Sequence, residues 1–408
     1  MKQFISRRSF LKAAGAATAL TAVSLGAPAA SAEETNCFLG EKSAVTILYT
    51  NDVHTYIDKK SPELTYAGIA ALKQSYVDAG QNVLLVDAGD HIQGTAYGSM
   101  DDGETIIKLM SEAGYDLATP GNHEFDYGMA RAKAAMKEAA FPYVSCNWVD
   151  LRTGLKVLPS IKIFTIGGAR IAFVGVTTPE TFTKSTPAYF MNASQTKYIY
   201  DILGGDDGQK LYKAVQKAID KAKLLGATYI IGLGHLGVDP SSAPWTSEEV
   251  IAHTTGFDAF IDGHSHTVMT EGENKEPIQS TGTALENVGV IVIDNATKKI
   301  EKNELVKLEG VKAEDETVKA LADKIITDVD TRLGEVFAKT EVDLDGNRDP
   351  GVRTKETNLG DLITDGILWY ATKDGKLDVP TDHVVALTNG GGIRASIKAG
   401  DISMKDIN

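Results

Sequence analysis

The stretch TPGNHEFD, residues 119–126, joins an apolar run at 115–118 to a segment near 127–140 that has the pattern of a helix. A turn of this kind needs only glycine or proline, and a helix start needs only one capping oxygen. This turn instead places an amide, an imidazole and two carboxylates between Asn122 and Asp126. Such a concentration of polar groups at the end of a strand indicates a site of chemistry.

Short apolar runs alternate with helical patterns on both sides of this turn, which predicts βαβ units and an α/β fold. A polar hairpin rhythm at 286–308 predicts strands that close the sheet. We expect helices near 63–79, 104–113, 127–140 and 208–225, and strands at VTILYT (45–50), NVLLVDA (82–88), YDLATP (115–120), YVSCN (143–147), IAFVGVT (171–177), TYIIGLG (228–234) and AFIDG (259–263).

Ligands of open α/β sheets bind beyond the carboxyl ends of the strands, so the residues that follow each apolar run are informative. Five of these runs are followed by Asp, Asn or His, and five of the eight histidines of the chain fall at these positions. Imidazole and oxygen donors without thiolates suit Mn²⁺, Zn²⁺, Fe or Mg²⁺. The residues concerned are Asp52, His54, Asp90, Asn122, His123, His235, His264 and His266.

The motifs D-x-H, G-D-x, G-N-H-E, G-H and G-H-x-H, in this order, resemble the calcineurin-like metallophosphoesterase family. GNHEFDYG together with GHSHT and NGGGIRA resembles its exported 5′-nucleotidase and 2′,3′-cyclic phosphodiesterase branch. The resemblance runs from about Val45 to the end of the chain. It implies a four-layer α/β/β/α sandwich, followed by a helical connector and a smaller α/β domain.

The resemblance also implies two divalent metal ions, with Mn, Zn or Co as the candidates and their identity left open. Two cations about 3.5–4 Å apart can clamp a phosphoryl group and lower the pKa of a bound water. Carried onto this chain, one metal is held by Asp52, His54 and His266, the other by Asn122, His235 and His264, and Asp90 bridges them.

His123 then stands beside a ligand and is expected to act in catalysis. Asp126, three positions later, can reach its ring from the first helical turn, fix the tautomer and favour the imidazolium. The imidazolium could stabilise the developing phosphoryl charge and donate a proton to the leaving alkoxide. The alternative, in which Asp126 only caps a helix, leaves His123 without a role.

Residues 309–334 predict a charged helical connector that ends at Gly334, and residues 335–408 a C-terminal domain that we expect to be incomplete. This domain should contain a strand near 335–343, a helix near 357–371 with Trp369 and Tyr370 in its core, a strand VVALTN (384–389) and a short final strand. RTKETNLGDLITD (353–365) and NGGGIRA (389–395) resemble the substrate-specificity segments of the family. The implied substrate residues are Arg353, Asn389 and Arg394.

The N-terminus has the form of a twin-arginine export signal, with SRRSFLK at 6–12, a mildly apolar stretch and an A-x-A cleavage site at 30–32. We therefore assign 1–32 to the signal and 33–308 to the catalytic domain, in a protein that is periplasmic, cell-surface or secreted. Cys37 and Cys146 could pair in an oxidising compartment or remain free thiols.

The net charge of the chain limits the classes of partner that it can bind. The signal contains four basic and no acidic residues, so its removal changes the formal net charge from −14 to −18. This charge repels nucleic acid duplexes and anionic lipid, and no segment after the signal predicts stable membrane insertion. A small anionic nucleotide can still bind where metals or arginines invert the local field. The oligomeric state is left open.

The leading hypothesis is a dimetal phosphohydrolase that releases phosphate from nucleoside 5′-monophosphates by attack of a metal-activated water. Within the same class, the alternatives are a 2′,3′-cyclic-nucleotide phosphodiesterase with 3′-nucleotidase activity and a nucleotide-sugar hydrolase. From another class, the chain could be an exported module that binds nucleotide or metal without turnover.

Overall fold

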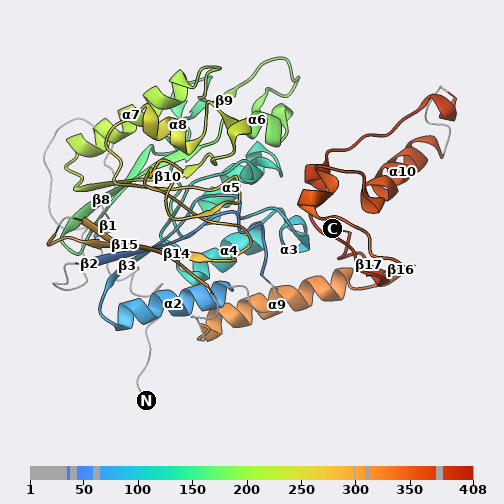
Figure 1. Cartoon of the computed structure of the whole chain (residues 1–408), viewed down its shortest axis with the longest axis horizontal. Coiled ribbons are helices and arrows are strands. Elements are labelled where there is room, and N and C mark those ends of the chain that lie inside the picture. Colours follow the sequence, from blue (N-terminus) through green and yellow to red (C-terminus); the bar gives the residue numbers. More distant parts are fainter. Residues whose placement is uncertain are drawn as a thin grey trace, which may run out of the picture. The chain divides into compact units, whose positions relative to one another are not determined.

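A computed structural model describes residues 35–36, 44–57, 65–297, 299–307, 313–373 and 380–407. The expected signal (1–32) and Cys37 lie outside these residues, so the structure does not address either. Contacts divide the chain into Met1–Thr35 and Asn36–Asn408, and the description below concerns the second unit. A two-residue strand, β1 (Thr35–Asn36), spans the division (Figure 1).

One sheet has the strand order β15-β14-β2-β3-β4. Its three strands β2, β3 and β4 run parallel, and β14 pairs antiparallel with both β2 and β15. The antiparallel pair confirms the hairpin expected at 286–308. The strands are β2 (Ala44–Thr50), β3 (Asn82–Asp87), β4 (Leu117–Ala118), β14 (Val288–Asp294) and β15 (Lys299–Val306).

A second sheet contains, in order, β7-β8-β10-β11-β13-β12. Its centre is parallel from β8 to β13, and β7 and β12 pair antiparallel with β8 and β13. The strands are β7 (Ile161–Ile166), β8 (Ala169–Thr177), β10 (Tyr229–His235), β11 (Ala259–Ile261), β12 (Val268–Met269) and β13 (Ile278–Thr281).

The two sheets pack face to face, and helices cover their outer faces (Figure 1). Ile47 and Val86 of the first sheet share one buried cluster with Phe173 and Ile231 of the second. The expected four-layer α/β/β/α sandwich is therefore confirmed. The covering helices are α2 (Tyr66–Asp78), α4 (Glu104–Ala113) and α9 (Glu316–Leu333) on the first sheet, and α7 (Gln209–Leu224) and α8 (Ser247–Ala252) on the second.

Burial on both faces explains why the central strands read as continuous apolar runs rather than as alternating ones. Every residue of β3 is buried, for example. The expected strand YVSCN is wrong, because only Tyr143 forms a bridge, to Ala118, and the chain pairs later as β5. A small sheet β6-β5-β9 forms there from β5 (Trp148–Asp150), β6 (Leu155–Lys156) and β9 (Tyr200–Ile202).

Short helices and turns complete this part of the chain. An aromatic cluster holds several of them in place, because Phe125, Trp148 and Phe190 are fully buried against one another. The segments are α3 (Ala96–Ser99), η1 (His123–Phe125), α5 (Met129–Glu138), α6 (Thr181–Lys184), η2 (Pro187–Phe190) and η3 (Pro240–Ser242).

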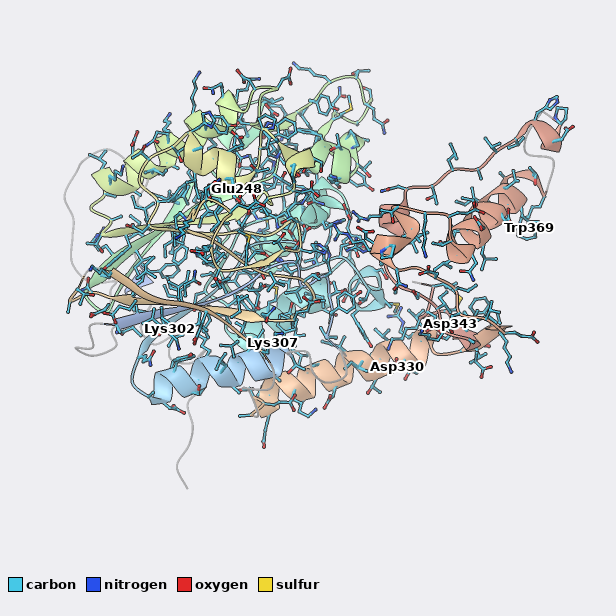
Figure 2. All side chains as sticks on the ribbon, in the orientation of Figure 1. Glu248, Lys302, Lys307, Asp330, Asp343 and Trp369 are labelled. Atoms are coloured by element: carbon cyan, nitrogen blue, oxygen red, sulfur yellow. The ribbon has the colours of Figure 1, made fainter. Side chains whose placement is uncertain are left out.

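Helix α9 packs on α2 and α4 through Val318, Ile325 and Val329, and it ends at Gly334 as expected. Asp330 near its end (labelled in Figure 2) accepts a hydrogen bond from Lys405 Nζ at 2.8 Å. The last elements are β16 (Val336–Thr340), an irregular turn η5 (Arg348–Val352), α10 (Asn358–Thr372), η6 (Thr381–His383), η7 (Gly390–Gly392) and β17 (Gly400–Ser403), and β16 pairs antiparallel with β17.

Two expectations for this C-terminal part are wrong. VVALTN forms no strand, and Val385 and Leu387 are 82% and 87% exposed because no described strand pairs with this segment. Trp369 (Figure 2) and Tyr370 lie outside any core, since no described element covers their side of α10. Lys373 Nζ instead lies over both rings, 4.4 and 4.6 Å from their centroids.

The close approach of β2 and β14 gives a test of the sandwich. A Cβ atom on Gly289 would lie 1.8 Å from Cζ of the buried Tyr49. Gly289→Ala should therefore lower the free energy of unfolding by about 1–3 kcal/mol through overpacking. Urea unfolding of the full chain measures this.

Gly366→Ala is the matched control, because Gly366 lies in α10 and its added Cβ would meet no atom within 4 Å. Alanine in a helix should stabilise by up to about 1 kcal/mol relative to glycine. Equal effects of the two substitutions would contradict the packing described for Tyr49.

Candidate metal and phosphoester site

The carboxyl ends of the parallel strands of both sheets meet at one place, and the predicted polar residues lie there. The loops after β2, β3, β4 and β11, and the last residue of β10, supply them. Their ligand atoms form three groups, within each of which every pair lies no more than 4.8 Å apart. The groups are Asp52, His54 and His266; His54, Asp90 and His123; and Asp90, His235 and His264.

The loops that carry these side chains have unusual backbones. Five of the predicted ligands have φ between 49° and 79°, the left-handed region that costs most residues about 1–3 kcal/mol. Gly121 makes the close approach possible, because a Cβ there would lie 2.2 Å from Asp90 Oδ1. The five residues are Asp52, His54, Asp90, His264 and His266.

The two carboxylate oxygens of Asp52 have different surroundings. Oδ2 accepts hydrogen bonds from Asn51 Nδ2 at 2.7 Å and from the backbone N–H of His264 at 2.9 Å. Oδ1 is buried without a hydrogen bond in the described part of the chain, 3.4 Å from His266 Nε2 and 3.8 Å from His54 Nε2. One oxygen is therefore left for a ligand.

Asp90 lies between the two expected ligand sets. Its Oδ1 accepts a hydrogen bond from the backbone N–H of His123 at 2.8 Å. Its Oδ2 is 3.0 Å from His235 Nε2, in one set, and 4.0 Å from His54 Nε2, in the other. A carboxylate in this position has the reach that a bridging ligand needs.

Backbone carbonyls orient two of the histidines. His54 Nδ1 donates to the carbonyl of Gln93 at 2.9 Å, and His235 Nδ1 donates to the carbonyl of Ala88 at 2.7 Å. Each ring therefore turns its Nε2 towards the site, an arrangement common in metal centres.

Several buried polar atoms of the site are satisfied only by a further group. Asn122 Oδ1 and His235 Nε2 are buried without a hydrogen bond of good geometry to any described residue, as is Asp52 Oδ1. Such atoms are costly unless something binds them. Burial opposes the imidazolium of His235, yet Asp90 and Asp52 raise its pKa to about 10. A field that holds a proton this strongly also favours a divalent cation, so the site fits metal ions with N and O ligands.

His123 and Asp126 form the expected pair. His123 Nδ1 and Asp126 Oδ2 are 2.5 Å apart, and the His123 ring lies 5.2 Å from that of His54. Burial lowers the pKa of His123, but Asp90 and the hydrogen bond that His123 donates to Asp126 outweigh it and raise the pKa above its usual value. The imidazolium is therefore favoured beside the cluster.

Glu124 is a functional residue that the sequence analysis did not use, although it lies within GNHEFD. Its carboxylate is buried and accepts backbone N–H groups of Asp90 and His91 at 2.8 Å and of Gly121 at 2.6 Å. It thus ties the loop after β3 to the loop after β4. Only knowledge of where the loops meet reveals this role.

Glu180 is a second residue that was missed. It follows β8, so the strand-end rule applied to the other strands would have included it. Its Oε2 accepts a hydrogen bond from Ser242 Oγ at 2.6 Å and lies 2.9 Å from His264 Nε2.

A cavity of about 200 Å³ opens beside this cluster and contains three arginines. Arg353 and Arg394 were expected there, and Arg348, which was not, donates from Nη1 to His266 Nδ1 at 3.0 Å. Asn389 does not line this cavity, and its Oδ1 accepts the N–H of Gly391 at 3.1 Å. His54 and His266, which belong to the cluster, also line this cavity.

A model of the calcineurin-like phosphoesterase family matches residues 45–268, more than half of the chain. The chain belongs to this family. Members use two divalent metal ions, which agrees with the Asp and His clusters described above. A model of the 5′-nucleotidase C-terminal domain matches residues 336–408, so both parts of the suspected family are confirmed.

Relatives agree with this assignment. A 5′-nucleotidase of Homo sapiens is 30% identical over 396 residues, which cover 86% of this chain and 64% of that protein. The trifunctional nucleotide phosphoesterase protein YfkN of Bacillus subtilis is 29% identical, and the match covers 89% of this chain and 26% of that protein. The crystal structure of a 5′-nucleotidase precursor from Thermus thermophilus superposes with a TM-score of 0.69 at 27% identity, covering 89% of this chain and 73% of that one. The chain therefore spans only part of these curated relatives.

A twin-arginine signal matches residues 5–24, which indicates export by that route. None of the described helices is long and apolar enough to cross a membrane. Cys146 is buried and forms no disulfide with any described residue.

Glu124→Gln tests the tie between the two loops. Glutamine turns one acceptor oxygen into a donor that faces a backbone N–H, and hydrogen bonds to charged groups contribute about 1.5–3 kcal/mol. We expect a loss of that order in the free energy of unfolding of the metal-depleted full chain, measured with urea. Glu112→Gln, at an exposed position of α4, should change it by less than about 0.5 kcal/mol. Equally small changes in the free energy of unfolding for the two variants would show that Glu124 does not stabilise the contact between the loops.

Proposed function

We propose that this chain is a metal-dependent phosphoric monoester hydrolase that releases phosphate from nucleoside 5′-monophosphates. The observation that carries the proposal is a cavity in which Arg348, Arg353 and Arg394 face the clustered Asp and His side chains. Guanidinium groups suit phosphate oxygens, and they give an acidic chain a local site for an anion. The similarity to 5′-nucleotidases in both domains favours nucleotides over other phosphate esters.

We assign the ligand roles and the domain limits as expected from the sequence. Residues 33–308 form the catalytic domain, 309–334 the connector and 335–408 the substrate domain. When bound, two divalent cations supply positive charge that polarises the phosphoryl group and acidifies water. The residues proposed to hold them are Asp52, His54 and His266 for one, Asn122, His235 and His264 for the other, and Asp90 for both.

Side chains of the protein supply the proton donor and the contacts to the substrate. Asp126 holds the Nδ1 proton of His123, so Nε2 is the nitrogen that donates a proton to the leaving oxygen of the ester. Arg353 and Arg394 bind the phosphate and hold it against the cluster. Asn389 shapes the glycine turn that follows it, and contacts the nucleoside from there.

A substrate panel tests the specificity. With Mn²⁺, Co²⁺ or Zn²⁺ added, AMP should be hydrolysed with a higher kcat/KM than p-nitrophenyl phosphate. Arg394→Ala should lower kcat/KM on both substrates, mainly through KM, because the arginine binds the phosphate that they share in ground state and transition state alike. Equal kcat/KM values on the two substrates would contradict nucleotide specificity. Faster release from 2′,3′-cyclic AMP or from a nucleotide sugar would identify one of the alternative activities. Binding of AMP without phosphate release by metal-replete protein would identify a binding module.

His123→Ala tests the proton donor. Because His123 is assigned to the transition state and not to coordination, the variant should keep both metals and lose about 10²–10⁴-fold in kcat on AMP. The loss should be smaller on p-nitrophenyl phosphate, whose leaving group needs no proton. Metal content by mass spectrometry and kcat on both substrates are the measurements.

His253→Ala is the control, because His253 is an exposed histidine beyond α8 that stacks on Tyr212 away from the cluster. It should leave metal content and both rates unchanged. Loss of a metal in His123→Ala would instead make His123 a ligand, as the group of His54, Asp90 and His123 allows by distance.

A further inference from the structure

The four histidines assigned as metal ligands differ in what contacts the ring nitrogen that points away from the site. Neutral backbone carbonyls accept from His54 and His235. His264 Nε2 instead lies 2.9 Å from the carboxylate of Glu180. His266 Nδ1 accepts from the guanidinium of Arg348 at 3.0 Å. The two proposed metal sites therefore have opposite charges behind one of their histidines.

Glu180 is held in place for this contact. It is 8% exposed, and the same oxygen that faces His264 accepts a hydrogen bond from Ser242 Oγ at 2.6 Å. The backbone of His264 is held as well, because its N–H donates to Asp52 Oδ2 at 2.9 Å. The His264 side chain can thus turn only with the loss of a buried hydrogen bond, and its Nδ1 is the nitrogen left for a metal.

A carboxylate behind a histidine ligand fixes the tautomer and raises the basicity of the ring, and loss of such a partner typically costs 10–100-fold in metal affinity. Arg348 has the reverse effect on His266. A guanidinium only donates, so this contact requires a lone pair on Nδ1 and places the ring proton on Nε2. That nitrogen is the one that lies 3.4 Å from Asp52 Oδ1. A metal at Nε2 must therefore displace a proton and weaken the contact with Arg348.

We propose that the two metals load in order, first at Asn122, His235 and His264, where Glu180 is a positioning residue for His264, and second at Asp52, His54 and His266. The proposal rests on the ligand roles assigned under the proposed function. It adds that the two sites differ in affinity, and that Glu180 and Arg348 are the side chains that create the difference.

The test is a calorimetric titration of the metal-depleted full chain with Mn²⁺ alone. The wild-type protein should bind two ions with distinct affinities. Glu180→Gln should weaken the tighter one by about 10–100-fold and leave the weaker one nearly unchanged. Arg348→Ala should strengthen only the weaker one. His235→Ala should abolish the tighter binding, and His54→Ala the weaker binding.

Two further variants are controls for the Glu180→Gln substitution. Glu249→Gln makes the same change at an exposed Glu–His pair, Glu249 and His253, whose facing atoms are 3.4 Å apart, and it should change neither affinity. Ser242→Ala keeps the carboxylate but removes its partner, so it should weaken the tighter site by less than Glu180→Gln. Thermal unfolding of the metal-depleted variants checks that each is folded.

The outcomes separate this inference from the function on which it rests. Two equal affinities in the wild type, or unchanged affinities in Glu180→Gln and Ser242→Ala with two ions still bound, overturn the loading order. Loss of the tighter ion in His54→Ala in place of His235→Ala overturns it as well. If instead the wild type binds no ion, or Asp90→Ala leaves both affinities intact, the dimetal assignment itself is wrong.

Discussion

The hydrogen bond from the backbone N–H of His264 to Asp52 Oδ2, 2.9 Å long, joins the two halves of the sandwich at the point where the site is built. Asp52 follows β2 of one sheet, and His264 follows β11 of the other. Asn51 strengthens the junction by accepting the N–H of Thr281 at 2.8 Å while donating to Asp52. Because every predicted ligand lies on a loop or strand end of one sheet or the other, their mutual distances depend on this junction. The sandwich supplies the frame, and this bond sets how its two edges meet.

A second support lies beneath the loop after β3. His91 is fully buried, 2.8 Å from Asp87 Oδ1 on one side and 2.8 Å from the hydroxyl of Tyr143 on the other. Burial opposes its charge, but Glu124 and Asp87 raise its pKa to about 9, so the ring is an imidazolium at neutral pH, with both carboxylates on its Nδ1 side. A buried charge is tolerated only when it is paired and hydrogen-bonded in this way. The loop that carries Asp90 is therefore held in place by a cluster of charged side chains that are not assigned as metal ligands.

The features that depend on the local order of residues could be predicted from the sequence. The roles of residues that depend on a neighbour far away in the chain could not. Apolar runs and the polar residues after them located the strands and the clustered side chains, because both follow from chain order alone. Glu124 was missed because its carboxylate binds the backbone of another loop. Arg348 was missed because its contact with His266 joins residues 82 positions apart. VVALTN has the composition of a strand, but a strand requires a partner, and no pattern within the segment reports whether one is present.

The left-handed backbone at five of the clustered residues limits which amino acids could ever stand there. Aspartate, asparagine and histidine tolerate this conformation several times better than most other residues, whereas the branched side chains of valine and isoleucine strongly disfavour it. The tolerated set is also the set of oxygen and imidazole donors that bind hard and borderline cations. Exchanges among aspartate, asparagine and histidine at Asp52, His54, Asp90, His264 or His266 can therefore alter metal preference while the loops keep their path. Backbone geometry and coordination chemistry select the same few residues, which gives this centre an adjustable chemistry on a fixed scaffold.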